Sequence, residues 1–242
     1  MIFVVVPAYN AEQSIGRVIR GLLCGTDYPD FAVAQNRGSS IPRERGIGTQ
    51  IVIVDDGSTD KTGEVALREG AVVIVHEVNR GQGAALQTGN EYALSRGATA
   101  VVHFDADGQL NPEDVKKALV FMAENNLDVV LGSRFLDQRT KMPWLKRYLI
   151  MPVSRWINFV FTGVKLSDVH NGFRVLNKKA LENIIITQDG MAHNSEIVAQ
   201  MKKHNLKFAE FPVEVVYKEF GQGVGGGFKI LADLLVNLFV GK

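Results

Sequence analysis

Short, mostly apolar segments alternate with helical segments along the first 131 residues of this chain. A strand that helices cover on both faces is apolar throughout, and such runs occur at Ile2–Val6, Ile51–Val54, Ala71–Val75, Ala100–Phe104 and Asp128–Leu131. Between them, apolar side chains recur at helical spacing in Glu12–Leu23, Asp60–Glu69, Gly83–Ser95 and after Asn111. This alternation predicts an α/β fold with a doubly wound, mostly parallel sheet.

Composition excludes several classes of protein. The 242 residues include 27 Lys and Arg against 26 Asp and Glu, a net charge of +1 that argues against a general nucleic-acid binder. A single cysteine, Cys24, excludes a disulfide framework. The chain starts in an apolar strand pattern and holds no run of 18 apolar residues, so we expect a cytoplasmic protein without a signal peptide or membrane span. We expect one domain over residues 1–242, with a long irregular stretch at Gly25–Thr49.

Polar or glycine-rich segments follow the predicted strands. They are Pro7–Asn10, Asp55–Ser58, Asn79–Gly81, Asp105–Asp107 and Gly132–Arg134. Open α/β sheets bind ligands at the carboxyl ends of their strands, so these five segments predict one shared site.

Asp105 and Asp107 place two carboxylates one residue apart at the end of a predicted strand. Alternate residues of extended backbone share a face, so the two side chains repel each other unless a cation lies between them. Carboxylate oxygens suit Mg²⁺ or Mn²⁺ when substrate phosphates complete the coordination, and Gln109 continues the alternation as a third oxygen ligand. The alternatives are that both acids are solvated loop residues, or that Asp107 caps the following helix.

Two other strand ends suggest a nucleotide. Asp55 or Asp56 offers a carboxylate to a base or ribose, although this run also suits helix capping. The glycines of Asn79–Gly83 allow backbone to approach a ligand closely. The dinucleotide fingerprint would follow the first strand, where the chain has Pro7–Asn10 instead, so a nicotinamide-dependent dehydrogenase is not expected.

In this order, the strand-end segments resemble the family 2 glycosyltransferases of the GT-A fold, in particular the dolichyl- and polyprenyl-phosphate mannosyl- and glucosyltransferases. The matching motifs are Val5–Asn10, Ile53–Asp60, Asn79–Ala85, Asp105–Gln109, Gly132–Arg134 and Asp168–Arg174, and the resemblance runs from residue 2 to about 217. It implies that residues 1–136 bind the nucleotide-sugar and residues 137–227 form the acceptor side. A C-terminal amphipathic helix is expected at 228–242.

The resemblance also implies a role for each matching residue. Those expected to bind the nucleotide-sugar are Pro7, Tyr9, Asp55, Asp56, Asp105, Ala106, Asp107 and Arg134. Those expected to hold Mg²⁺ or Mn²⁺ are Asp105, Asp107 and Gln109, and the catalytic set is Asp105, Asp107, Arg134 and Asp168. The acceptor phosphate is expected at Arg147 and Arg174. A structural ion pair is the alternative for Arg134 and for Arg174.

The implied reaction suits these residue types. A divalent ion stabilises a departing diphosphate as a Lewis acid, and arginine adds bidentate hydrogen bonds to phosphate. A phosphate monoester acceptor is already an anion and needs no general base, whereas a hydroxyl acceptor needs a carboxylate to take its proton. The chain lacks the Gln-x-x-Arg-Trp motif of processive sugar-acceptor relatives, which favours a phosphate acceptor.

We therefore predict a metal-dependent inverting enzyme that moves a hexose from a nucleotide-sugar, of the GDP-mannose or UDP-glucose type, to a polyprenyl or dolichyl phosphate. One alternative is a soluble family 2 enzyme acting on a saccharide hydroxyl in polysaccharide or cell-wall synthesis. Another is a catalytically silent nucleotide-sugar sensor, against which the set Asp105, Asp107, Gln109 and Arg134 argues. Whether the chain forms an oligomer stays open.

The segment Gln138–Ser167 contains no carboxylate, but it holds six basic residues and both tryptophans. Basic residues with interfacial aromatics suit a membrane surface that carries anionic lipid. This pattern predicts peripheral binding to the inner face of the cell membrane. The alternative is a basic helix that packs on the sheet.

Replacing Lys146 and Arg147 together with Glu should therefore weaken binding to anionic vesicles. Each basic residue near an anionic surface contributes about 1 kcal/mol, so reversing two charges has a clear effect. Co-sedimentation with anionic and neutral vesicles measures this. Unchanged sedimentation of the double variant would remove the membrane prediction and leave the transferase prediction standing.

Overall fold

Alternate residues of the first strand point into two separate cores. In this computed structural model, which describes residues 1–24, 48–136, 159, 163–168 and 171–215, strand β1 (Ile2–Ala8) is buried along its whole length. Val4 and Val6 pack into one core, whereas Phe3 and Val5 pack into the other. The apolar run at the N-terminus is thus explained by helices on both faces of the sheet.

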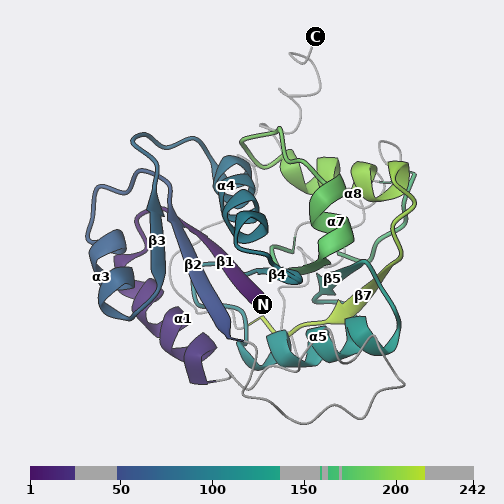
Figure 1. The fold of residues 1–242 in the computed structure, drawn as a ribbon, viewed down its shortest axis with the longest axis horizontal. Coiled ribbons are helices and arrows are strands. Elements are labelled where there is room, and N and C mark those ends of the chain that lie inside the picture. The colour runs from purple at the N-terminus through teal and green to yellow at the C-terminus, as the bar shows by residue number, and fades with distance from the viewer. Residues whose placement is uncertain (25–47, 137–158, 160–162, 169–170, 216–242) are drawn as a thin grey trace.

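Seven strands form one sheet in the order β3-β2-β1-β4-β6-β5-β7 (Figure 1). The strands after β1 are β2 (Thr49–Asp55), β3 (Val72–Val75), β4 (Ala100–His103), β5 (Val129–Ser133), β6 (Arg174–Asn177) and β7 (Phe208–Pro212). Strand β6 pairs antiparallel with β4 and β5, and the other pairings are parallel. The predicted α/β fold with a mostly parallel sheet is confirmed.

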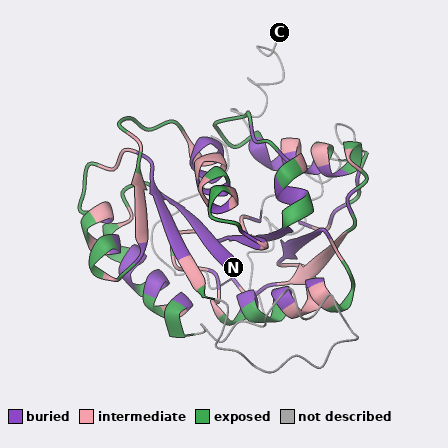
Figure 2. Cartoon of the chain, viewed as in Figure 1, coloured by how far each residue is buried: buried purple, intermediate pink, exposed green. Residues whose placement is uncertain are grey.

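Helices cover both faces of this sheet (Figures 1 and 2). One core contains buried residues of α1 (Glu12–Cys24), α3 (Thr62–Arg68) and α5 (Glu113–Glu124). The other contains buried residues of α4 (Gln82–Ser95), α7 (Lys178–Asn183) and α8 (His193–Lys203). Within the part of the chain that the structure describes, no helix is long and apolar enough to cross a membrane.

The strand order reverses between β1 and β4. From β1 the chain builds outward through β2 and β3, and it then returns to place β4 on the other side of β1. A crevice opens at such a switch point, beyond the carboxyl ends of the two strands. The segments that follow β1 and β4 are therefore the walls of the expected site.

Strand β6 was not predicted from the sequence, and it shapes the site because it runs antiparallel. Its first residue, Arg174, pairs with His103 at the carboxyl end of β4 and with Leu131 of β5. The loop that precedes β6 therefore reaches the crevice at Asn171–Phe173. A parallel strand in this place would bring its last residue there instead.

Asp128, just before β5, joins three elements of the second half. Its Oδ2 accepts hydrogen bonds from Lys179 Nζ at 2.9 Å and the backbone N–H of Lys207 at 2.8 Å. Its Oδ1 accepts one from Asn177 Nδ2 at 3.0 Å. Burial favours the neutral carboxyl, but the bonds from Lys179, Lys207 and Asn177 outweigh it and lower the pKa of Asp128.

Asp128→Asn should lower the free energy of unfolding by about 1–3 kcal/mol at pH 7, because the new amide NH₂ group faces either Lys179 and the N–H of Lys207 or the Nδ2 of Asn177, all of which are donors. The folded-state pKa is lowered, so the stabilisation is present above the unfolded pKa of roughly 4 and is lost as pH falls through the folded pKa.

Urea unfolding at pH 7 and pH 3 tests this expectation. The difference in the free energy of unfolding between wild type and Asp128→Asn should be smaller at pH 3 than at pH 7. A matched control is Asp189→Asn. The Asp189 carboxylate is 55% exposed in an ion pair with Arg80, so its loss should change the free energy of unfolding by less than about 1 kcal/mol. An equal difference at both pH values would contradict the role given to the charge of Asp128.

Candidate active site

Two adjoining cavities lie where the strand order reverses, and Asp105, Asp107 and Gly172 line both of them. The larger has a volume of about 600 Å³ and the smaller about 130 Å³. The predicted residues that line the larger cavity are Pro7, Tyr9, Asp56, Asp105, Ala106 and Asp107. Those that line the smaller one are Asp105, Asp107, Gln109 and Arg134. The structure thus brings together most of the predicted site.

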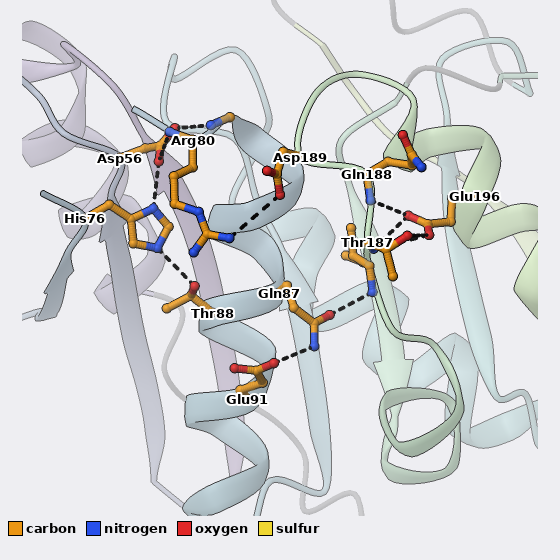
Figure 3. A network of polar contacts seen from close by, with 12 residues as sticks. Asp56, His76, Arg80, Gln87, Thr88, Glu91, Thr187, Gln188, Asp189 and Glu196 are labelled. Carbon is orange, nitrogen blue, oxygen red and sulfur yellow. Dashed lines mark hydrogen bonds and ion pairs between the residues drawn. The ribbon is translucent and has the colours of Figure 1, made fainter. Parts of the chain in front are cut away.

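Asp56 is buried in the wall of the larger cavity and organises the loop beside it (Figure 3). Its Oδ1 lies 2.7 Å from His76 Nδ1, and the other ring nitrogen of His76 lies 3.0 Å from Thr88 Oγ1. The backbone N–H groups of Arg80 and Gly81 donate to the two carboxylate oxygens at 3.0 and 2.7 Å. A carboxylate has about four acceptor positions, so Asp56 can still accept a hydrogen bond from a ligand.

Asp55 does not share this place. Its Oδ1 accepts the N–H of Ser58 at 3.0 Å, and its Oδ2 faces Gly63 of α3. Among the described residues it lines neither cavity. Successive side chains at a strand end point to opposite faces, so Asp56 faces the larger cavity and Asp55 does not. The predicted binding of the nucleotide by Asp55 stays a prediction.

The glycines of the Asn79–Gly83 segment leave room for the backbone of the loop between α7 and α8. A Cβ at Gly81 or Gly83 would overlap the carbonyl of Asp189 or Gln188, and the N–H of Gly83 donates to Asp189 O at 2.7 Å. Asn79 and Gly81 also line the larger cavity, so the approach of this backbone to a ligand stays a prediction. Gly81 and Gly83 have a structural role as well. They let the loop between α7 and α8 close onto the start of α4.

The same loop is held from two sides (Figure 3). From α8, the carboxylate of Glu196 accepts the N–H groups of Thr187 and Gln188 at 3.0 Å each. From α4, Gln87 Oε1 accepts the N–H of Ile186 at 2.8 Å. The loop in turn positions the start of α8, whose neighbouring residues Met191 and Asn194 line the larger cavity.

Asp105 follows the last residue of β4 by two positions, and Asp107 lies in the turn that comes next. Asp107 is exposed and its Oδ1 accepts the N–H of Gln109 at 2.9 Å, so it does not cap α5. Burial, and then the charge of Asp107, raise the pKa of Asp105 to about 6, against the opposing effect of Arg174 and Arg134. The alternation argument was wrong about the backbone, but the two carboxylates do lie close enough to repel each other.

Asp168 fixes Arg134 with a bidentate pair. Arg134 Nε donates to Asp168 Oδ2 at 2.6 Å, and Nη2 donates to Oδ1 at 2.7 Å. The Asp168 side chain is fully buried, and Glu210 accepts the N–H of Asp168 from the other side. Among the described residues Asp168 lines neither cavity, and its place in the catalytic set stays a prediction. It holds the arginine that does line the smaller cavity.

Arg174 is buried beneath the site, with 2% of its surface exposed. Its Nη2 donates to Asn194 Oδ1, and its Nη1 has no partner among the described residues. Burial lowers its pKa to about 10, with Asp105 and then Asp168 acting in the opposite direction, so it remains a cation at neutral pH. Among the described residues Arg174 lines neither cavity, and its contact with the acceptor phosphate stays a prediction. Arg147 lies outside the described residues.

The model of the family described as "Glycosyl transferase family 2" matches residues 3–185. The chain belongs to this family. It is 30% identical to the UDP-N-acetylglucosamine–dolichyl-phosphate N-acetylglucosaminyltransferase of Methanococcus voltae, over all of this chain and 97% of that protein. It is 28% identical to the polyprenol monophosphomannose synthase of Mycolicibacterium smegmatis, over 74% of this chain and 71% of that one. These relatives confirm the resemblance to the polyprenyl-phosphate branch.

Solved structures agree with the fold of a family 2 glycosyltransferase. A glucosyl-3-phosphoglycerate synthase of Mycobacterium tuberculosis, crystallised with Mn²⁺, UDP and glucosyl-3-phosphoglycerate, superposes with a TM-score of 0.65 at 18% identity. The match covers 97% of this chain and 78% of that one. The predicted GT-A fold and the prediction of a glycosyltransferase are confirmed.

Several residues of this glycosyltransferase site were not singled out from the sequence. Gln82, Asn171, Met191 and Asn194 line the cavities, and His76 orients Asp56. Asn171 stands inside a motif that the resemblance already marked, so that motif was a usable signal. Met191 and Asn194 follow an irregular loop, and only the packing of that loop on α4 brings them to the site.

Gly172→Ala should displace Asp105 and weaken metal-dependent binding of nucleoside diphosphate. A Cβ at this position would overlap both carboxylate oxygens of Asp105, so the Asp105 side chain must turn away from its present position. The matched control is Gly190→Ala, where a Cβ meets nothing within 4 Å.

Calorimetry with UDP and GDP, with and without Mn²⁺, measures the effect. We expect at least a ten-fold loss for Gly172→Ala and none for Gly190→Ala, with both variants folded by circular dichroism. Wild-type affinity in Gly172→Ala would show that the contact with Asp105 does not matter.

Proposed function

We propose that this glycosyltransferase moves a hexose from a nucleotide-sugar to a polyprenyl phosphate, with inversion at the anomeric carbon. One observation carries the proposal. Asp105 and Asp107 line two cavities at once, and the smaller of these also contains the guanidinium of Arg134. A donor in the larger cavity and an anionic acceptor in the smaller one would meet at this pair of carboxylates.

The larger cavity suits the donor. Tyr9 is 51% exposed and lines this cavity with Pro7, which leaves its ring available to a base. Asp56 lines the same cavity with an acceptor position for a base or ribose. The diphosphate would then extend towards Asp105 and Asp107.

The chemistry of the pair fits Mg²⁺ or Mn²⁺. Burial, and then the charge of Asp107, raise the pKa of Asp105 despite the charges of Arg174 and Arg134, and a divalent cation would offset the remaining repulsion. Asp105, Asp107 and Gln109 would hold the ion. Within the described ranges no three His, Cys, Asp or Glu side chains form a metal cluster, which accords with an ion that needs substrate phosphate to complete its coordination. When bound, such an ion stabilises the departing diphosphate as a Lewis acid.

The smaller cavity suits the acceptor. Asp168 holds the plane of the Arg134 guanidinium, and a fixed guanidinium attracts and orients a phosphate group. A phosphate oxygen is an anion at neutral pH, so it can attack the anomeric carbon directly while the bond to the diphosphate breaks. The names of the two relatives, one with dolichyl phosphate and one with polyprenol monophosphomannose, support this acceptor class.

A transfer assay tests the proposal. UDP-N-acetylglucosamine, UDP-glucose and GDP-mannose are offered in turn with farnesyl phosphate and Mn²⁺, and the lipid product is followed by mass spectrometry. We expect one of the three donors to give a glycosyl farnesyl phosphate. Transfer to a saccharide hydroxyl, with none to farnesyl phosphate, would replace the proposed acceptor by the soluble alternative.

Asp107→Asn should uncouple nucleotide binding from the metal. The amide keeps the size of the side chain but loses the charge, so added Mn²⁺ should no longer raise the affinity for the nucleoside diphosphate. Glu113→Gln, an exposed acid in the first turn of α5, serves as the control. Wild-type binding that is indifferent to Mn²⁺ and to chelator would remove the metal from the proposal.

A further inference from the structure

Asn171 carries a hydrogen-bond donor that no described protein atom satisfies. The residue is 6% exposed, and its Oδ1 accepts the N–H of Phe173 at 2.9 Å. Its Nδ2 is buried and has no partner among the described residues. Asn171 also lines the smaller cavity, beside Gln109 and Arg134. A buried amide donor therefore stands at the place where the acceptor is proposed to bind.

The orientation of this amide is fixed. A backbone N–H needs an acceptor, so the bond from Phe173 assigns the oxygen and leaves Nδ2 on the other side of the amide group. The bond from residue 173 to the side chain of residue 171 is also a local turn that holds the Asn171 side chain in place. Rotating the amide or the whole side chain to give Nδ2 another partner would break the hydrogen bond of this turn.

The surroundings select the chemistry of its partner. Nδ2 can only donate, so its ligand must offer an acceptor. The cationic Arg134 lines the same cavity and favours an anionic acceptor group, and a buried donor without a partner costs free energy that such a group returns on binding. Phosphate oxygens meet both requirements.

We propose that Asn171 Nδ2 donates a hydrogen bond to a phosphate oxygen in the smaller cavity. This inference rests on the proposed function, which supplies two sources of that oxygen. One is the phosphate of the polyprenyl acceptor. The other is the diphosphate of the donor, which can reach the smaller cavity because Asp105 and Asp107 line both cavities. Asn171 is then a further binding residue for the reaction and sets the affinity for one of these two groups.

Two variants remove the donor in different ways. Asn171→Ser lacks the amide, but its hydroxyl can still accept the N–H of Phe173 in a weaker local turn. Asn171→Asp keeps both the shape and the acceptor for Phe173, and it places a negative charge where Nδ2 stood. Asn183→Ser is the matched control, because Asn183 is half-buried on α7, lines neither cavity, and its Nδ2 already donates to Lys179 O at 2.8 Å.

Two readouts distinguish the sources of the phosphate. The first is the Kd of UDP and of GDP with Mn²⁺, and the second is the Kd and KM of farnesyl phosphate with the donor that wild type uses. Loss of a hydrogen bond to a charged group predicts about a ten-fold weakening or more for Asn171→Ser, and a larger one for Asn171→Asp. A change in the farnesyl phosphate constants alone assigns Asn171 to the acceptor, and a change in the nucleotide Kd assigns it to the diphosphate.

The outcomes separate this inference from the proposed function. If wild type transfers sugar to farnesyl phosphate and both variants match it in every constant, Nδ2 meets only water and the inference fails alone. If wild type gives no transfer, the proposed function fails, and the two binding constants still decide whether Asn171 contacts phosphate. In each case Asn183→Ser should behave as wild type, and thermal melting should show all variants folded.

Discussion

Repulsion between Asp105 and Asp107 is the constraint around which the site is arranged. Burial raises the pKa of Asp105 after the end of β4, and the charge of the neighbouring Asp107 raises it further. Positive charge reaches Asp105 from Arg174 at the start of β6 and from Arg134 just after β5. Both arginines come from strands that lie beyond β4 in the sheet. The order of the strands therefore also determines the electrostatics of the site.

The antiparallel strand β6 makes this arrangement possible. Because β6 runs against β4 and β5, the loop before it arrives at the same edge of the sheet as the ends of its neighbours. That loop brings Gly172 against Asp105 and Asn171 into the smaller cavity. The direction of β6, and not only its position in the sheet, therefore decides that Gly172 and Asn171 reach the site.

Close approach of backbone to backbone completes the walls. Gly83 and Gly81 let the loop between α7 and α8 pack onto the start of α4, and Gly89 lets α4 pack onto Val5 of β1. A side chain at any of these positions would hold two elements apart by the thickness of a methyl group. The larger cavity thus depends on contacts made by residues from both halves of the chain.

The sequence by itself determined the β-α alternation, the parallel character of the first five strands and the strand-end segments that form the site. Those features follow from local patterns, because burial on both faces makes a strand apolar and a strand end exposes polar residues. The sequence could not decide which of Asp55 and Asp56 faces the larger cavity. It also could not show that Arg174 is buried as a counter-charge or that Asp168 holds Arg134. Strand β6 and the loop before α8 escaped prediction for the same reason. Their places depend on pairing and packing between residues far apart in the chain, and only the tertiary structure brings those residues into contact.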